Sequence, residues 1–172
     1  MARYYRKQGF VVGCGDEATF GLLPIIKRGW ARRGNHPIVI INSKNKCTNV
    51  FGARSKTAFV FSFAIRKNQK SFVKFLNKLI KRWNRVCLFV DNGPCHHGKL
   101  VDAFMREHRK TFRMFYFPVY SPELNPIEQC WKPARMKLSN RILPSMSTAK
   151  YYLVKTFNNE KILPKMFKYL SD

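Results

Sequence analysis

Three acidic residues stand out because the chain of 172 residues contains only nine Asp and Glu. Asp16 and Asp91 each follow an apolar run, and Glu128 lies near the start of a helical pattern. Three carboxylates that converge on one point repel each other unless a cation lies among them. Oxygen ligands with open positions suit Mg²⁺ or Mn²⁺. Two such ions, about 3.5–4 Å apart, can activate a water or hydroxyl and stabilise the leaving oxygen in phosphodiester displacement.

The charge balance points to a polyanionic partner. Lys and Arg number 33 against nine acids, a net charge of +24, and cations placed on phosphates release condensed counterions. No apolar run approaches the roughly 18 residues of a membrane-spanning helix, and no signal-peptide core is present. The five cysteines include no CxxC pair, so neither a disulfide framework nor a zinc ribbon is indicated. We expect a reduced protein of the cytoplasm or nucleoid without a membrane partner.

The apolar pattern changes along the chain from strands alone to alternating helices and strands. Stretches rich in Val, Ile, Phe and Thr come first, and an amphipathic helical pattern with a basic outer face begins at Lys70. This order favours a mixed sheet with helices packed on it. We predict strands at 10–14, 37–42, 47–53, 57–65, 85–90 and 112–117, and helices at 70–85, 99–110, 125–140 and 147–172.

Four segments carry a resemblance to a known family. They are Asp16-Glu17, the basic segment GWARRG at 29–34, DNGPCH at 91–96 and YSPELNPIE at 120–128. Together they resemble the catalytic domain of mariner-like transposases, and more closely the bacterial and archaeal insertion-sequence branch of the DDE superfamily. Between Asp91 and Glu128 lie 36 residues, close to the spacing of this branch. The resemblance covers roughly residues 10–140.

The resemblance implies an α/β, RNase H-like (retroviral-integrase-type) fold with a mixed five-stranded sheet. It implies that Asp16, Asp91 and Glu128 are the catalytic, metal-binding residues, with Asn92 and His96 in support. Two Mg²⁺ or Mn²⁺ ions would be held when DNA is bound. The implied reaction is hydrolytic cleavage at the ends of an insertion sequence, followed by attack of the freed 3′-hydroxyl on target DNA. The implied partners are double-stranded DNA and a second copy of the chain, in a prokaryotic cell.

Each candidate has a plainer alternative. Asp91 can be an ordinary turn residue, and Glu17 can replace Asp16 as the ligand. Glu128 also fits the third position of a helix capped by Asn125. His96 can be a plain loop histidine. A zinc site made by residues 95–97 is disfavoured because three adjacent side chains cannot easily all turn to one ion.

Basic residues near these motifs are candidates for DNA contacts that do not read sequence. Trp30 and its basic neighbours can lie on bases or phosphates, or Trp30 can be packed inside a solvated loop. The basic face of the helix at 70–85 is a further candidate surface. The candidate DNA-binding residues are Lys27, Arg28, Trp30, Arg32, Arg33, Lys99, Lys132 and Arg135.

We expect two parts in this chain, a catalytic domain at 1–145 and a C-terminal helical tail at 146–172 packed on it. The N-terminal helix-turn-helix region of full-length relatives is expected to be absent here, because about a dozen residues precede the first predicted strand. Two rival functions remain open. One is a non-catalytic, basic DNA-binding remnant of a transposase, and the other is an RNA-cleaving nuclease of the same fold.

Overall fold

A mixed five-stranded sheet forms the centre of the described structure, in the order β3-β2-β1-β4-β5. The computed structural model describes residues 1–163 except 24, 28–29, 37, 39–44, 119–124, 160 and 162. β1 pairs antiparallel with β2 and parallel with β4. β2 and β3 are antiparallel, and β4 and β5 are parallel. The strands are β1 (Val11–Gly21), β2 (Cys47–Ser55), β3 (Phe59–Ala64), β4 (Val86–Val90) and β5 (Phe112–Tyr116).

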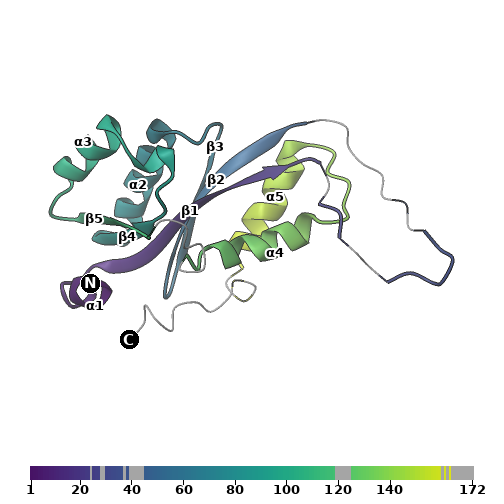
Figure 1. The fold of residues 1–172 in the computed structure, drawn as a ribbon, viewed down its shortest axis with the longest axis horizontal. Coiled ribbons are helices and arrows are strands. Elements are labelled where there is room, and N and C mark those ends of the chain that lie inside the picture. The colour runs from purple at the N-terminus through teal and green to yellow at the C-terminus, as the bar shows by residue number, and fades with distance from the viewer. Residues whose placement is uncertain are drawn as a thin grey trace.

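Helices cover both faces of this sheet (Figure 1). One face carries α2 and α3, and the other carries α4 and α5. A short helix, α1, packs through Tyr5 against the rings of Phe10 and Phe115. The helical elements are α1 (Ala2–Lys7), α2 (Gln69–Trp83), the 3₁₀ turn η1 (Pro94–His96), α3 (Lys99–Glu107), α4 (Glu128–Leu138) and α5 (Met146–Phe157).

The central strands are apolar because they are buried from both sides. On β2, Phe51 enters the core under α2, while its neighbour Val50 enters the core under α4 and α5. Successive side chains on a strand point to opposite faces, so one short apolar run supplies two cores. The same alternation turns Asp16 and Glu17 of β1 to opposite faces of the sheet.

α2 follows directly from its sequence. The Asn68 side chain accepts a hydrogen bond from the Ser71 backbone N–H at 2.9 Å, which caps the first turn. Five apolar side chains at helical spacing are buried, and Asn84 ends the helix with a φ of 60°. The buried residues are Phe72, Phe75, Leu76, Leu79 and Trp83.

The mixed five-stranded sheet confirms the predicted fold class, but several predicted boundaries are wrong. β1 continues to Gly21 instead of stopping before the acids, because Asp16 and Glu17 stay in register with β2. α1 was not predicted. α4 begins at Glu128 rather than at residue 125. Of the predicted strand at 37–42, residues 37 and 39–42 lie outside the described structure, as do residues 164–172 of the predicted C-terminal helix.

The connection from β1 to β2 projects away from the sheet, at the right of Figure 1. Its base is tied to the residues after α4, because Asn140 accepts a hydrogen bond from the Lys27 backbone N–H at 2.9 Å and donates to the Lys27 carbonyl at 3.3 Å. The Asn140 backbone N–H also donates to the Ile25 carbonyl. We call the described residues 25–27 and 30–36 the arm. Among the described helices, none is long and apolar enough to cross a membrane.

Candidate active site

Asp16 and Asp91 lie at the same edge of the sheet because their strands are parallel neighbours. The last registered pair between β1 and β4 is Cys14 with Phe89, and each aspartate comes two residues later in its strand direction. The two carboxylates are close enough for the charge of Asp91 to raise the pKa of Asp16. Such an edge beyond the carboxyl ends of parallel strands is where open α/β sheets bind ligands.

Asp16 is held by the indole of α4. The Trp131 Nε1–H donates a hydrogen bond to Asp16 Oδ2 at 2.8 Å. Burial is the largest influence on this carboxyl group and raises its pKa to about 6, against the lowering effect of the Trp131 hydrogen bond. The charges of Glu17 and Asp91 raise it further. Asp16 and Asp91 thus offer carboxylate oxygens of the kind that divalent cations prefer.

Gly52 makes room for this indole. It lies opposite Asp16 in the β1–β2 pairing, and a Cβ atom on it would come within 2.5 Å of Trp131 Cη2 and 3.0 Å of Phe59. Trp131 is 3% exposed and also contacts the rings of Phe20 and Phe59 edge-on. The missing side chain at position 52 therefore sets how closely α4 approaches Asp16.

Glu128 is the first residue of α4 and is exposed. Positions three apart on a helix share a face, so Glu128 lies on the face that brings Trp131 to Asp16. Within the described part of the chain, Asp16, Asp91 and Glu128 do not form a set of three ligand atoms within 4.8 Å. The three acids thus do not close into a tight cluster within the described residues.

Asp91 sits in a turn that is tied down by hydrogen bonds. Its Oδ1 accepts from the Gly93 backbone N–H at 3.0 Å and lies 2.8 Å from His96 Nδ1. The His96 hydrogen bond is the main reason that the pKa of Asp91 lies below its usual value. Asn92 does not turn to the acids; its Nδ2 donates to the Phe117 carbonyl at 3.0 Å and so ties the turn to the chain after β5.

His96 is the buried centre of a second group on the α2 face. Its side chain is 1% exposed, and Nε2 lies 3.2 Å from Glu17 Oε2. Burial lowers the pKa of His96, but the bonds to Asp91, Cys95 and Glu17 outweigh it and place the pKa well above the usual value. Glu17 therefore contacts His96 and Cys95, on the face of β1 opposite to Asp16.

The alternative in which Asn125 caps the helix is not what the structure has. α4 has Ile127 at its N-cap position, and no side chain makes a cap hydrogen bond there. Asn125 is 6% exposed, and its Oδ1 has no hydrogen-bond partner. Glu128 is the first residue of the helix, and the sequence pattern placed the helix start three residues too early.

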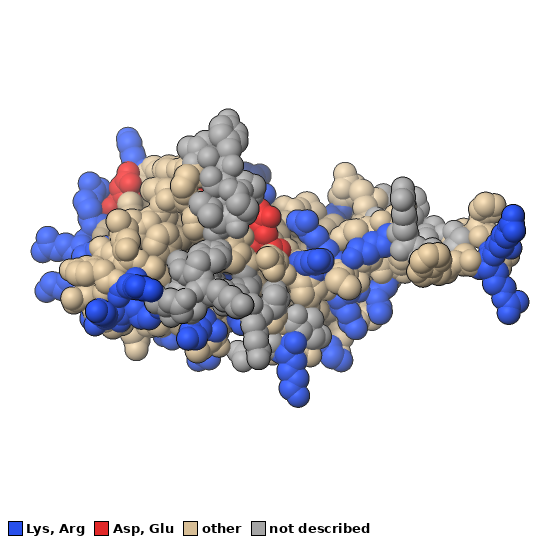
Figure 2. Space-filling model, turned by 60° about the horizontal axis from the view of Figure 1, so that its bottom comes forward, with Lys and Arg blue, Asp and Glu red and all other residues tan. Residues whose placement is uncertain are grey.

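The candidate DNA-binding residues are exposed wherever they are described. Trp30 is 105% exposed, which contradicts the alternative of a packed tryptophan. Basic side chains follow the arm to its tip, as Figure 2 shows. Arg28 lies outside the described residues. The other exposed candidates are Lys27, Arg32, Arg33, Lys99, Lys132 and Arg135.

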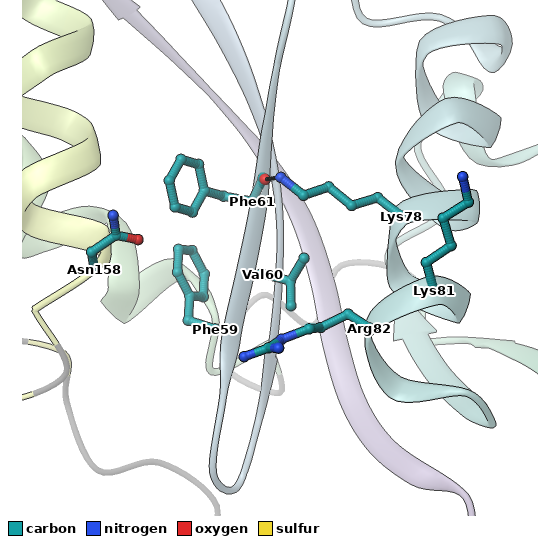
Figure 3. Close-up of a pocket in the computed structure, with 7 residues that line it drawn as sticks. All are labelled: Phe59, Val60, Phe61, Lys78, Lys81, Arg82 and Asn158. Carbon is teal, nitrogen blue, oxygen red and sulfur yellow. Dashed lines mark hydrogen bonds between the residues drawn. The ribbon is translucent and has the colours of Figure 1, made fainter.

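A second basic surface lies along edge strand β3 (Figure 3). Lys78, Lys81 and Arg82 of α2 line a pocket of about 390 Å³ with Phe59, Val60 and Phe61 of β3 and Asn158. Lys78 Nζ donates to the Phe61 carbonyl at 2.7 Å, which occupies one acceptor of the open edge. Lys81 and Arg82 are exposed, so their positive charges lie on the surface.

Trp131 and Gly52 were missed by reasoning from the sequence, and Cys95 was considered only for a zinc site with its two neighbours, which was disfavoured. Trp131 follows Glu128 by three positions, so a signal for a shared helix face was present. That Trp131 would donate a hydrogen bond to Asp16 could not be predicted from the sequence, because 115 residues separate the two. Gly52 carries no signal of its own within a β-rich stretch.

Comparisons with known proteins give the family of the chain and relatives of its fold. The family model described as DDE superfamily endonuclease matches residues 11–150. The insertion element IS630 uncharacterized 39 kDa protein of Shigella sonnei is 31% identical over 123 residues, which cover 68% of this chain and 35% of that protein. The chain therefore spans about a third of the length of this relative.

Solved structures share the fold. The Mos1 strand transfer complex matches with a TM-score of 0.70 and 19% identity, over 92% of this chain and 50% of that one. The catalytic domain of Mos1 mariner transposase matches with a TM-score of 0.63 and 17% identity, over 92% of this chain and 75% of that one. The fold is thus RNase H-like, of the integrase type. On the family match, the chain belongs to the DDE superfamily of endonucleases.

Proposed function

We propose that the chain is the catalytic domain of an insertion-sequence transposase, which cuts DNA and joins the freed 3′-end to target DNA. The observation that carries this is the position of Asp16 and Asp91 on adjacent parallel strands, with the helix of Glu128 tied to Asp16 through Trp131. The relationship to a protein of insertion element IS630 supports the same reading and a prokaryotic setting.

In this proposal, Asp16, Asp91 and Glu128 hold two Mg²⁺ or Mn²⁺ ions. Such ions supply activation of the attacking water or hydroxyl and stabilisation of the leaving oxygen. The chain's own contribution is to position the carboxylates. Trp131 fixes one oxygen of Asp16 at 2.8 Å, and His96 fixes one oxygen of Asp91 at 2.8 Å. Carboxylates held in place before DNA arrives need less reorganisation during the reaction.

The basic surfaces would hold the DNA backbone. The exposed cations of the arm, with Trp30, form one surface, and Lys81 and Arg82 at the β3 edge form another. Cations on such exposed surfaces are proposed to bind phosphates of double-stranded DNA without reading its sequence. Residues 1–145 would be the catalytic part. α5 of the 146–172 part packs through Leu153 and Phe157 into the core that contains Trp131. The active complex is proposed to be a homodimer on paired DNA ends.

The test is nicking of supercoiled plasmid in Mg²⁺ or Mn²⁺. We expect activity that EDTA abolishes and that falls by at least about a hundredfold in Asp91→Asn, which keeps the acceptor for His96 but removes a charge. Glu107→Gln is the matched control, because Glu107 is 76% exposed on α3, outside the site. Its activity should equal that of the wild type.

Mn²⁺ binding, measured on the same proteins, separates two kinds of failure. Binding that Asp91→Asn weakens, without nicking, would keep the metal site and reject cleavage by this chain alone. Absence of both nicking and Mn²⁺ binding would overturn the proposal and leave a non-catalytic, basic DNA-binding protein. Cleavage of RNA in preference to DNA would instead favour the nuclease alternative.

A further inference from the structure

Three side chains on the α2 face, two buried and one half-buried, form a group from which the proposed reaction uses only the contact of His96 with Asp91. Glu17 comes from β1, and Cys95 and His96 come from η1. One ligand atom from each lies within 4.8 Å of the others. Cys95 is 5% exposed, the His96 side chain 1% and the Glu17 side chain 12%. Within the described residues, no other group of three Asp, Glu, His or Cys ligands is as close.

The polar atoms of this group lack adequate hydrogen bonds. His96 Nε2 and Glu17 Oε2 are fully buried and lie 3.2 Å apart as an ion pair, but within the described residues neither makes a hydrogen bond of good geometry. Buried nitrogen and oxygen atoms without partners are costly. A cation among the three side chains would satisfy both atoms at once.

Two separations within this group are close to those of a tetrahedral zinc site, and all three ligand atoms lie within 4.8 Å of one another. Zn–S bonds of about 2.3 Å and Zn–N or Zn–O bonds of about 2.0–2.1 Å place neighbouring ligand atoms roughly 3.3–3.5 Å apart. Here Cys95 Sγ lies 3.4 Å from Glu17 Oε1, and His96 Nε2 lies 3.2 Å from Glu17 Oε2. Small adjustments of side chains would bring all three onto one ion.

The remaining nitrogen of the imidazole is already oriented. His96 Nδ1 lies 2.8 Å from Asp91 Oδ1 and 3.0 Å from the Asp91 carbonyl oxygen. A carboxylate on one ring nitrogen, with the other free for the metal, is the usual support of a zinc-bound histidine. The Phe72 ring, with its centroid 4.5 Å away, fixes the imidazole plane from the side.

We propose that Glu17, Cys95 and His96 bind a Zn²⁺ ion, separate from the carboxylate site at Asp16, Asp91 and Glu128. A thiol and an imidazole favour Zn²⁺ over Mg²⁺. Binding releases the Cys95 thiol proton and any proton on His96 Nε2 to solvent, while His96 keeps its Nδ1–H and continues to donate it to Asp91. His97 is not a ligand, because its ring stacks on Tyr116. The ion would join η1 to β1 and so fix the turn that carries Asp91.

Cobalt binding tests this proposal directly. The full 172-residue chain, kept reduced with a phosphine, is titrated with Co²⁺ in excess Mg²⁺, which occupies oxygen-ligand sites. We expect one Co²⁺ per chain, with the near-ultraviolet absorption of a cobalt–thiolate bond, and we expect Zn²⁺ to displace it. Cys95→Ser should abolish the absorption. Cys47→Ser is the matched control, because Cys47 is exposed and lies outside the group.

Two further variants separate loss of the zinc site from misfolding and from loss of the proposed reaction. Glu17→Gln should weaken Co²⁺ binding by at least about tenfold while leaving the thiolate absorption, and it serves if Cys95→Ser fails to fold. Glu128→Gln should leave cobalt binding unchanged although it removes nicking, so failure of the zinc site and failure of the proposed reaction are distinguishable. Absence of thiolate absorption in the wild type, or absorption that survives Cys95→Ser, would overturn the zinc site.

Discussion

The indole of Trp131 donates a hydrogen bond to Asp16 at 2.8 Å and thereby joins helix α4 to strand β1 across the candidate active site. Both partners are mostly withdrawn from water, and a hydrogen bond to a charged group contributes about 1.5–3 kcal/mol. Because Glu128 precedes Trp131 by one helical turn, the bond also fixes where α4 presents its first residue.

Removal of the indole N–H should impair the reaction more than the fold. Trp131→Phe keeps an aromatic ring but leaves Asp16 without its donor, so the pKa of Asp16 should rise further. We expect plasmid nicking at pH 7 to fall by about tenfold, a loss of roughly 1.4 kcal/mol, and its pH midpoint to move upward. Trp83→Phe is the control, because the buried Trp83 Nε1 has no hydrogen-bond partner to lose. Equal losses in both variants would contradict the role given to the hydrogen bond.

The pKa of Asp16, raised to about 6 from 3.8, predicts a pH-dependent stability. Between about pH 4 and 6 the folded state holds a proton that the unfolded state has released, so the metal-free protein loses stability as pH rises. Asp16→Asn keeps an acceptor for Trp131 and removes the charge. Above pH 6 we expect it to be more stable than the wild type by about 1–3 kcal/mol. Urea denaturation in EDTA at pH 4.5 and 7.5 measures this.

At lower pH, the stability of the protein depends on Asp91. Its pKa is lowered mainly by His96, so its contribution to stability is present above about pH 4 and is lost as the pH falls below that value. Mg²⁺ should stabilise the wild type at pH 7.5 but leave Asp16→Asn unchanged. If Asp16→Asn is no more stable than the wild type in EDTA at pH 7.5, the buried charge of Asp16 does not destabilise the metal-free protein, and this prediction is wrong.

Gly52 should not tolerate a methyl group. Its Cβ would lie 2.5 Å from Trp131 Cη2, so Gly52→Ala must displace the indole and with it the donor to Asp16. We expect a loss of about 1–3 kcal/mol from overpacking, measured by urea denaturation, together with reduced nicking. Gly21→Ala is matched, because its Cβ meets nothing closer than 3.6 Å. Nicking that is normal in Gly52→Ala would show that the indole position does not matter.

His96 should matter for folding as well as for the site. His96→Ala leaves the carboxylates of Glu17 and Asp91 without their shared cation, and loss of one partner from a buried ion pair costs about 3–5 kcal/mol. We expect a loss of stability near the lower end of this range, roughly 3 kcal/mol, because the Asp91 side chain is 52% exposed and water screens its charge. His97→Ala, which loses only a stacking contact with Tyr116, should cost far less. Thermal unfolding of the two variants at pH 7 compares them.

The arm should bind DNA without reading its sequence. Replacing Arg32 and Arg33 by Ala should weaken binding to unrelated duplexes alike and reduce the slope of log affinity against log salt by about two. Replacing Lys7 and Lys110, exposed but outside the arm, is the control of equal charge. Fluorescence anisotropy at several salt concentrations gives both quantities. A slope unchanged by the arm substitutions would exclude phosphate contacts there.

Much of the fold was predictable because its signals are local. The helix at Gln69–Trp83 follows from apolar spacing and the Asn68 cap, and β4 follows from an uninterrupted apolar run. β1 was underestimated because polar residues usually end a buried strand, whereas Asp16 and Glu17 lie within one that passes the candidate site. The start of α4 was misplaced because Asn125 and Pro126 imitate a capped helix without forming one.

The candidate site was predictable only in part, because some of its contacts join residues that are far apart in the sequence. Asp16 and Asp91 could be paired in advance, since each follows an apolar run typical of a central strand and neighbouring central strands can bring such residues together. The contacts that hold them could not, because Trp131 reaches Asp16 across 115 residues and Glu17 reaches Cys95 across 78. Such contacts depend on the rotation of a helix and on the face of a strand, which a list of residue types does not contain.

The opposite orientations of Asp16 and Glu17 restrict how the gene for this domain can change. Deletion or insertion of one codon upstream in β1 would exchange the two acids between faces, with every other side chain of the strand. Glu17 would then meet the aromatic core around Trp131, and the imidazole of His96 would face an aspartate one carbon shorter. Frame-preserving length variation should therefore be far better tolerated in the arm than between Val11 and Glu17, which a library of single-codon deletions would map.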